Sequence, residues 1–264
     1  GFKFTHQQFV KEANLTPAKR ALYGMIQAST YDNEANLPDD YISSLYESYP
    51  PQLISAYLRG QFVNLTSGAV YPDFDRKLNH TDEEIKPGEP LIIGMDFNVL
   101  KMAAVVYVIR EGRPLALDEM VGVRDTPTMA TLLNERFPLH DMTVIPDAAG
   151  QAKSSKNSSE SDHQILRDKG FRVEVSGTNP AIKDRINSVN ALILNGDGER
   201  TLFVNTNKCP RLTETLEQQV YDDFGMPDKK SGLDHVGDAG GYPIAKRFPI
   251  IKPVTRIDLP MFGF

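Results

Sequence analysis

The sequence has a single cysteine, no tryptophan and no apolar run long enough to span a bilayer. With only Cys209 available, an internal disulfide and a cysteine-cluster zinc site are both excluded. The first residues lack the charged and then apolar profile of a secretory signal, so we expect no membrane contact. The chain opens at Gly1 without a methionine, and we expect it to be an excised fragment of a longer protein.

An excess of positive charge is also missing. Lysine and arginine together number 29 against 35 acidic residues, so no overall field draws the chain onto nucleic acid. Any contact with DNA therefore has to be local. The 264 residues, of which 40% are hydrophobic, are enough for one large domain with a substantial core.

The chain changes character near residue 88. Residues 1–88 are interrupted by prolines and contain only short helical patterns, which predicts a linker with short helices. Residues 89–264 predict a folded domain that begins with three strands, expected over 91–97, 102–109 and 114–121. The links between these strands are too short for a parallel return, so the strands are predicted to be antiparallel neighbours. Helices and strands are then expected to alternate, with helices over 126–137, 162–170, 181–195, 211–220 and 233–245, and strands over 142–146, 171–176 and 201–204. This alternation predicts an α/β fold, with a mixed sheet flanked by helices.

Aspartates stand where apolar segments end. Asp96 closes the strand over 91–97, and Asp147 directly follows an apolar run over 142–146. A buried carboxylate is costly unless a cation neutralises it, and sites in such sheets form at the carboxyl ends of strands. We therefore predict that these two aspartates share a metal. Asp238 is a third candidate, with Asp234 one turn earlier in the predicted last helix.

The residue type indicates the metal and the chemistry. Oxygen-only sites suit Mg²⁺ or Mn²⁺, and two such ions about 3.5–4 Å apart stabilise both the attacking and the leaving oxygens of phosphodiester cleavage. Four basic residues are candidates for holding the DNA backbone: Lys153, Lys156, Lys183 and Arg185. The loop that carries the first two could instead be simply solvated, and the last two bind phosphate only if they face the metals. We expect Asp118, Glu119 and Asp125 to be surface residues.

Motifs over most of the chain resemble those of the large terminase subunits of tailed bacteriophages. They include Tyr49-Pro50-Pro51, Val70-Tyr71-Pro72-Asp73-Phe74, Gly94-Met95-Asp96-Phe97 and the ending Asp234-His235-x-x-Asp238-Ala239-x-x-Tyr242. The resemblance implies a ribonuclease-H-like nuclease that cuts concatemeric double-stranded DNA at the capsid portal, in the host cell cytoplasm. It also implies Asp96, Asp147 and Asp238 as metal ligands and His235 as a neighbour of the metals, with Asp234 a possible accessory residue. The implied partners are the portal protein, the small terminase subunit and an ATPase domain of the full-length chain.

The chain departs from this family in two places. It contains no Gly-x-x-x-x-Gly-Lys-Ser/Thr phosphate loop, so the motor is absent and residues 1–88 are interpreted as the tail of the motor region. Gly240-Gly241 stand where many relatives have bulkier residues, and the end of the last helix is expected to be distorted. We expect the isolated domain to be monomeric. Two alternatives stay open: a structure-selective junction nuclease of the same fold, and a non-catalytic adaptor that contacts DNA and the portal.

Overall fold

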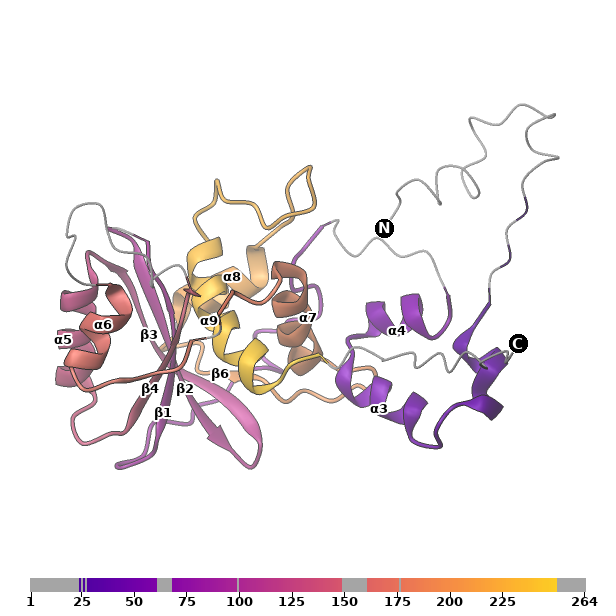
Figure 1. Ribbon diagram of the computed structural model, residues 1–264, viewed down its shortest axis with the longest axis horizontal. Coiled ribbons are helices and arrows are strands. Elements are labelled where there is room, and N and C mark those ends of the chain that lie inside the picture. The colour runs from indigo at the N-terminus through magenta and orange to yellow at the C-terminus, as the bar shows by residue number, and fades with distance from the viewer. Residues whose placement is uncertain are drawn as a thin grey trace, which may run out of the picture.

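A six-stranded mixed sheet forms the centre of the molecule (Figure 1). The computed structural model describes residues 24, 26, 28–60, 68–98, 100–148, 161–175 and 177–250. Across the sheet, the strands are β5 (Arg172–Val173), β4 (Met142–Pro146), β1 (Leu91–Asp96), β2 (Met102–Arg110), β3 (Arg113–Val123) and β6 (Phe203–Val204). Neighbours among β1, β2 and β3 are antiparallel, whereas β4, β5 and β6 join the sheet in parallel. The predicted mixed sheet, three antiparallel strands followed by parallel ones, is confirmed.

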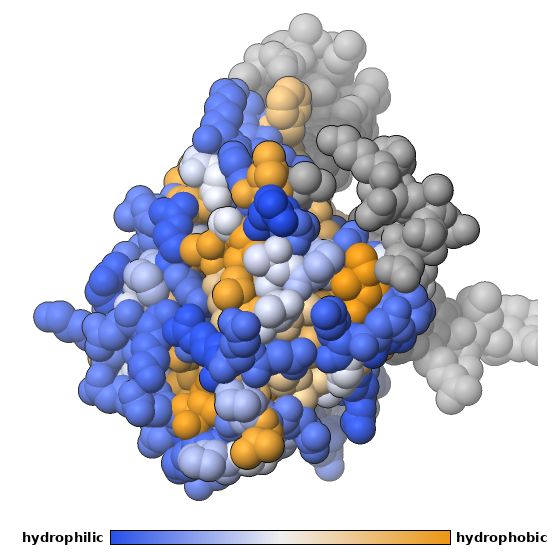
Figure 2. Space-filling model, turned by 90° about the vertical axis from the view of Figure 1, so that its left-hand side faces the viewer, coloured by the Kyte–Doolittle hydropathy of each residue, from blue (hydrophilic) through white to orange (hydrophobic). Residues whose placement is uncertain are grey.

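Helices cover both faces of this sheet (Figure 1). On one face lie α5 (Thr126–Arg136) and α6 (Asp162–Asp168). On the other lie α7 (Ile182–Ile193), α8 (Pro210–Gln218) and α9 (Asp234–Arg247), with α9 packed directly on β1 and β2. Seen from the end that carries α5 and α6, the surface is mostly hydrophilic, with apolar side chains in small patches (Figure 2). Within the described ranges, no helix combines the length and the apolar character that crossing a membrane requires.

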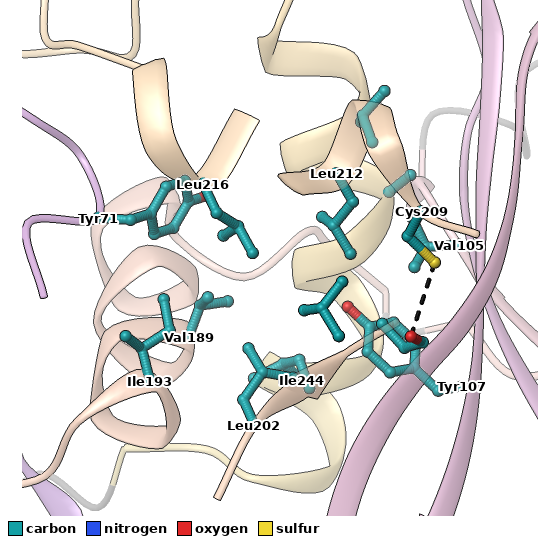
Figure 3. Close-up of a cluster of buried hydrophobic side chains, with 14 of the residues drawn as sticks. Tyr71, Val105, Tyr107, Val189, Ile193, Leu202, Cys209, Leu212, Leu216 and Ile244 are labelled. Atoms are coloured by element: carbon teal, nitrogen blue, oxygen red, sulfur yellow. Dashed lines mark hydrogen bonds between the residues drawn. The ribbon is translucent and has the colours of Figure 1, made fainter. Parts of the chain in front are cut away.

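Alternation along the strands divides the side chains between two cores. In β2, the cluster under α7, α8 and α9 receives Ala103, Val105 and Tyr107, and the cluster under α5 and α6 receives Met102, Ala104, Val106 and Val108. Figure 3 shows the first of these clusters, where side chains of α7, α8 and α9 converge on the sheet. The same alternation in β1 sends Leu91, Ile93 and Met95 toward α5 and α6. Asp96 is therefore left on the α9 side of the sheet.

Residues just before position 88 are built into the same core. Val70 and Tyr71 belong to the cluster under α7, α8 and α9, and Asn79 donates hydrogen bonds to the carbonyls of Ile193 (3.1 Å) and Leu202 (2.9 Å). Farther toward the amino terminus lie η1 (Thr30–Asn36), α3 (Tyr41–Ser48) and α4 (Pro51–Tyr57). The helices α3 and α4 have their own small cluster of buried side chains, and Gly196 N–H, beyond the end of α7, donates to the Tyr46 carbonyl at 2.9 Å.

Two carboxylates of β3 are buried, which corrects the expectation that they lie on the surface. Asp118 and Glu119 are only 6% and 8% exposed. Glu119 accepts hydrogen bonds from the backbone N–H groups of Arg211 at 2.7 Å and Leu212 at 2.8 Å. These groups belong to the first turn of α8, whose N-cap residue, Cys209, turns its own side chain toward the Ala116 carbonyl. Because helix starts leave N–H groups unpaired, a carboxylate from a strand distant in sequence is stabilised there.

Replacing Glu119 with alanine is expected to lower the free energy of unfolding by about 2 kcal/mol, because two buried N–H groups lose a charged acceptor. Urea denaturation followed by circular dichroism measures the change. Glu135→Ala, on the exposed side of α5, is the matched control and should change stability by less than about 0.5 kcal/mol. Equal stabilities for the two variants would contradict the capping role.

Candidate metal centre

Asp96 lies at the carboxyl end of β1 and is 8% exposed. Its Oδ2 atom accepts a hydrogen bond from His235 Nδ1, on α9, at 3.0 Å. Burial, together with the negative charges of Asp238 and Asp147, raises the pKa of Asp96 from 3.8 to about 6, while His235 opposes the shift. The three aspartates named from the sequence thus interact electrostatically in one region.

His235 is held from both sides of its ring. Asn98, two residues beyond β1, donates its side-chain N–H to His235 Nε2 at 2.7 Å. Nε2 then acts as an acceptor, so the ring proton lies on Nδ1, where it is donated to Asp96. Asn98 is a residue that the sequence interpretation missed. Its place directly after the strand that carries Asp96 was the available signal.

Asp147 follows β4, and its backbone N–H donates to the Met95 carbonyl at 2.9 Å. Two residues distant in sequence hold this turn. Asn179 donates to Asp147 Oδ1 at 2.6 Å and accepts from Ala148 N–H at 2.8 Å, and His163 Nε2 donates to the Asp147 carbonyl at 2.9 Å. Burial lowers the pKa of His163, which favours its neutral form in this position. Neither Asn179 nor His163 was predicted to take part, since neither shows a spacing that connects it to Asp147.

Asp238 lies one turn into α9 and pairs with Arg185 of α7. Arg185 is buried, with 4% of its side chain exposed, whereas Asp238 is partly exposed. Burial raises the pKa of Asp238, and the Arg185 charge acts against that rise. The Arg185 guanidinium also lies 4.7 Å from the centre of the Tyr242 ring, a cation–π contact. One of the three aspartates therefore already has a cationic partner from the protein.

Asp234 begins α9 and is 7% exposed. Its Oδ1 atom is buried and has no hydrogen-bond partner among the described residues, and it lies 3.9 Å from His235 Nε2. The start of a helix stabilises a negative charge. An unsatisfied carboxylate oxygen beside His235 and Asp238 is a further donor for a cation.

The helix α9 continues through Gly240 and Gly241 to Arg247, so the distortion expected at the glycine pair does not interrupt it. The missing side chains leave room for neighbours. Tyr107 donates its hydroxyl to the Gly240 carbonyl at 3.1 Å, and a Cβ atom at position 241 would lie 2.8 Å from two carbons of the Arg185 side chain.

The donor atoms of this cluster are of the type that binds a hard divalent cation. All are carboxylate oxygens, which Mg²⁺ and Mn²⁺ prefer, and the pKa of Asp96 is raised in part because neighbouring negative charges repel its own. Among the described residues, however, no three His, Cys, Asp or Glu side chains are grouped closely enough to hold a metal ion. The chemistry of the cluster suits a cation, while the arrangement pairs Asp96, Asp147 and Asp238 with protein partners.

The four predicted DNA contacts have different outcomes. Lys153 and Lys156 lie outside the described residues. Lys183 is exposed in the first turn of α7. Arg185, two residues later, points into the protein toward Asp238, because its helix packs against α9. Of the two basic residues at the start of α7, only Lys183 has its side chain on the surface.

The sheet order, the helices on both faces and the acids at the ends of β1 and β4 define a ribonuclease-H-like nuclease fold. The model of the Terminase RNaseH-like domain family matches residues 93–247, more than half of the chain, and the chain belongs to this family. The resemblance to phage large terminases, inferred from the sequence motifs, is confirmed. A comparison with curated protein sequences finds no match.

Solved structures of large terminases share the fold. One is a large terminase from a thermophilic bacteriophage, with a TM-score of 0.65 and 19% identity over 93% of this chain and 59% of that one. The same protein in complex with ATP-gamma-S has a TM-score of 0.63 and 17% identity, over 81% of this chain and 54% of that one. The P22 large terminase nuclease domain has a TM-score of 0.53 and 17% identity, over 71% of this chain and 96% of that one. The matched region thus spans a little over half the length of the thermophilic phage protein.

Proposed function

We propose that this domain is a metal-dependent endonuclease of the viral genome-packaging machinery, which cuts concatemeric double-stranded DNA. The observation that carries the proposal is the burial of Asp96 at the carboxyl end of β1, where it accepts a hydrogen bond from His235 of α9 and is affected by the negative charges of Asp238 and Asp147. A protein does not gain stability by keeping several acids near one another without a cation. The energetic cost of keeping these carboxylates near one another is explained if they serve to bind a cation.

In this proposal Asp96, Asp147 and Asp238 hold Mg²⁺ or Mn²⁺. Two bound ions would supply stabilisation of the charge that develops on the attacking and leaving oxygens of the phosphodiester. His235 orients the Asp96 carboxylate through Nδ1, and Asn98 fixes the ring that does so. Asn179 and His163 keep the Asp147 turn in place. Asp234 adds an acceptor beside this cluster, and exposed Lys183 is suited to contact a DNA phosphate.

The proposed partners follow from the family. The whole protein would join this domain to an ATPase domain, and would act with the portal protein and the small terminase subunit in the host cytoplasm. The structure of the thermophilic phage large terminase with ATP-gamma-S shows that this longer relative binds an ATP analogue. The present sequence has no phosphate loop, so in this proposal the energy for packaging comes from another part of the protein.

Cleavage of supercoiled plasmid DNA in Mn²⁺ tests the proposal. We expect the purified chain to nick and linearise the plasmid, EDTA to stop the reaction, and Asp147→Asn to reduce it below detection. Asp141→Asn is the matched control, because this exposed aspartate lies at the opposite end of β4, and it should cleave like the wild type. Because DNA binding would depend on local contacts between basic residues and phosphates, activity should also fall as salt rises.

The outcome separates the proposal from its alternatives. Plasmid cleavage that depends on Asp147 supports the endonuclease. Cleavage of a synthetic four-way junction, with linear and supercoiled duplexes left intact, would instead indicate a junction nuclease. Binding to DNA and portal protein without cleavage of any substrate would indicate the adaptor.

A further inference from the structure

Arg185 has a role in this structure that its sequence position does not suggest. It lies near the start of α7, beside exposed Lys183, yet 4% of its side chain is exposed. Its guanidinium meets the Asp238 carboxylate and stacks on Tyr242. All three side chains lie between α7 and α9, which pack against each other.

The backbone of α9 is shaped to receive this arginine. A Cβ atom at position 241 would come within 2.8 Å of both Cγ and Cδ of Arg185, closer than such atoms approach. The glycine therefore lets the stem of Arg185 lie against the helix. In contrast, a Cβ at the adjacent Gly240 would meet Tyr107 and Leu212 instead. The two glycines thus serve different neighbours, and only Gly241 seats the arginine.

We propose that Arg185 is an internal counter-ion that occupies Asp238 and competes with a divalent cation for it. The inference rests on the proposed function, in which Asp238 is a metal ligand. It also accounts for the finding that, among the described residues, no three His, Cys, Asp or Glu side chains lie close enough together to hold a metal ion. Asp238 is held by α7, so cation binding at Asp96 requires the Arg185–Asp238 pair to loosen.

The positive charge of Arg185 determines whether its replacement raises or lowers metal affinity. A positive charge in contact with a ligand carboxylate repels an incoming cation and reduces the negative potential that attracts it. Without that charge, Asp238 would act on the cation together with Asp96 and Asp234, and binding should tighten. A pair that is only structural would change stability when broken but would leave metal affinity unchanged. Metal affinity is therefore the measurement that distinguishes the two roles.

Titration of the full chain with Mn²⁺, followed by calorimetry and by the electron paramagnetic resonance of free Mn²⁺, tests the inference. At about pH 8, where unpaired carboxylates are ionised, Arg185→Met should bind Mn²⁺ at least about tenfold more tightly than the wild type. Gly241→Ala keeps both charges but displaces the arginine stem, so it should shift affinity in the same direction even if Arg185→Met folds poorly. Gly240→Ala is the matched control and should bind Mn²⁺ like the wild type.

A double-variant cycle shows whether the effect passes through Asp238. In the Asp238→Asn background, Arg185→Met should no longer tighten binding, because the site of competition is gone. One combination of results would overturn this inference and leave the proposed function standing. In it, the wild type binds Mn²⁺ and Asp96→Asn does not, but neither Arg185→Met nor Gly241→Ala binds Mn²⁺ more tightly than the wild type. If no protein in the series binds Mn²⁺ saturably, the proposed function fails and this inference fails with it.

Discussion

Asp96→Asn is expected to abolish Mn²⁺-dependent cleavage of plasmid DNA while the domain stays folded. Replacing a residue that merely orients a metal ligand lowers metal affinity or activity about 10–100-fold. Replacing a direct ligand at the centre of the site should lower it more. The amide keeps the size of the carboxylate and can still accept the hydrogen bond from His235. The loss should therefore come from the missing charge and not from a changed structure.

The same variant is expected to be more stable than the wild type when divalent ions are absent. The folded-state pKa of Asp96 is about 6, raised from 3.8, so the folded protein holds a proton that the unfolded chain releases. Below about pH 4 the carboxyl group is protonated in both the folded and the unfolded state, so it does not lower stability. The destabilisation grows as the pH rises from about 4 to about 6, and it is fully present above about pH 6. Asp96→Asn removes a penalty of up to about 3 kcal/mol at neutral pH.

Urea denaturation in EDTA across this pH range measures the gain, with Asp141→Asn as the control. The difference between Asp96→Asn and the wild type should be near zero at about pH 4 and largest above about pH 6. A destabilised Asp96→Asn protein at neutral pH would mean that Asp96 supports the fold, and it would remove the electrostatic argument for a cation site. Full cleavage activity in this variant would overturn the role of Asp96 as a ligand.

Gly94→Ala should be among the most damaging small substitutions in the chain. Gly94 lies in β1 directly under α9, where a Cβ atom would be 1.8 Å from the Ala239 carbonyl oxygen and 2.6 Å from the Pro243 ring. Because Pro243 has no N–H, the Ala239 carbonyl lacks its usual helical donor and packs against the glycine. The helix would have to move away from the strand, and we expect a loss of about 3–5 kcal/mol in the free energy of unfolding.

This loss has a functional side, because β1 carries Asp96 and α9 carries Asp238. Any Gly94→Ala protein that folds should therefore also bind Mn²⁺ more weakly. Gly177→Ala is the matched control: a Cβ there meets nothing within 4 Å, and stability should change by less than about 0.5 kcal/mol. If the two variants unfold at the same urea concentration, the contact between strand and helix is looser than the structure indicates.

Most elements of the domain were predictable because the signals that specify them are local. Apolar periodicity located all six strands and the helices α5 to α9, and the short links made β1, β2 and β3 antiparallel neighbours. Where periodicity was weak, the prediction was less accurate. The strand expected over 171–176 is only Arg172–Val173, and Asp118 and Glu119 were assigned to the surface. Burial of such acids depends on distant backbone donors that no local pattern reveals.

The candidate site shows the same division. Asp96 and Asp147 were identified because acids that end apolar segments are unusual, and Asp238 because it lies in the ending that resembles the terminase family. In the structure, Asp238 and Asp147 both contribute to the raised pKa of Asp96. Their role as ligands stays a prediction. The residues that hold them were not found from sequence: Asn179 lies 32 residues from Asp147, and Arg185 lies 53 residues from Asp238. Nothing in the spacing of these pairs favours one partner over another.

Local chemistry therefore specified the α/β class, the order of its elements, the terminase kinship and the acids to examine, because each depends on neighbouring residues and their periodicity. The packing of α7 and α9 specified the partner of each acid. Arg185 meets Asp238 because Gly241 admits its stem, and Asp96 meets His235 because Gly94 lets α9 lie on β1. Such contacts depend on distances between elements far apart in the chain, which become defined only when the helices pack on the sheet.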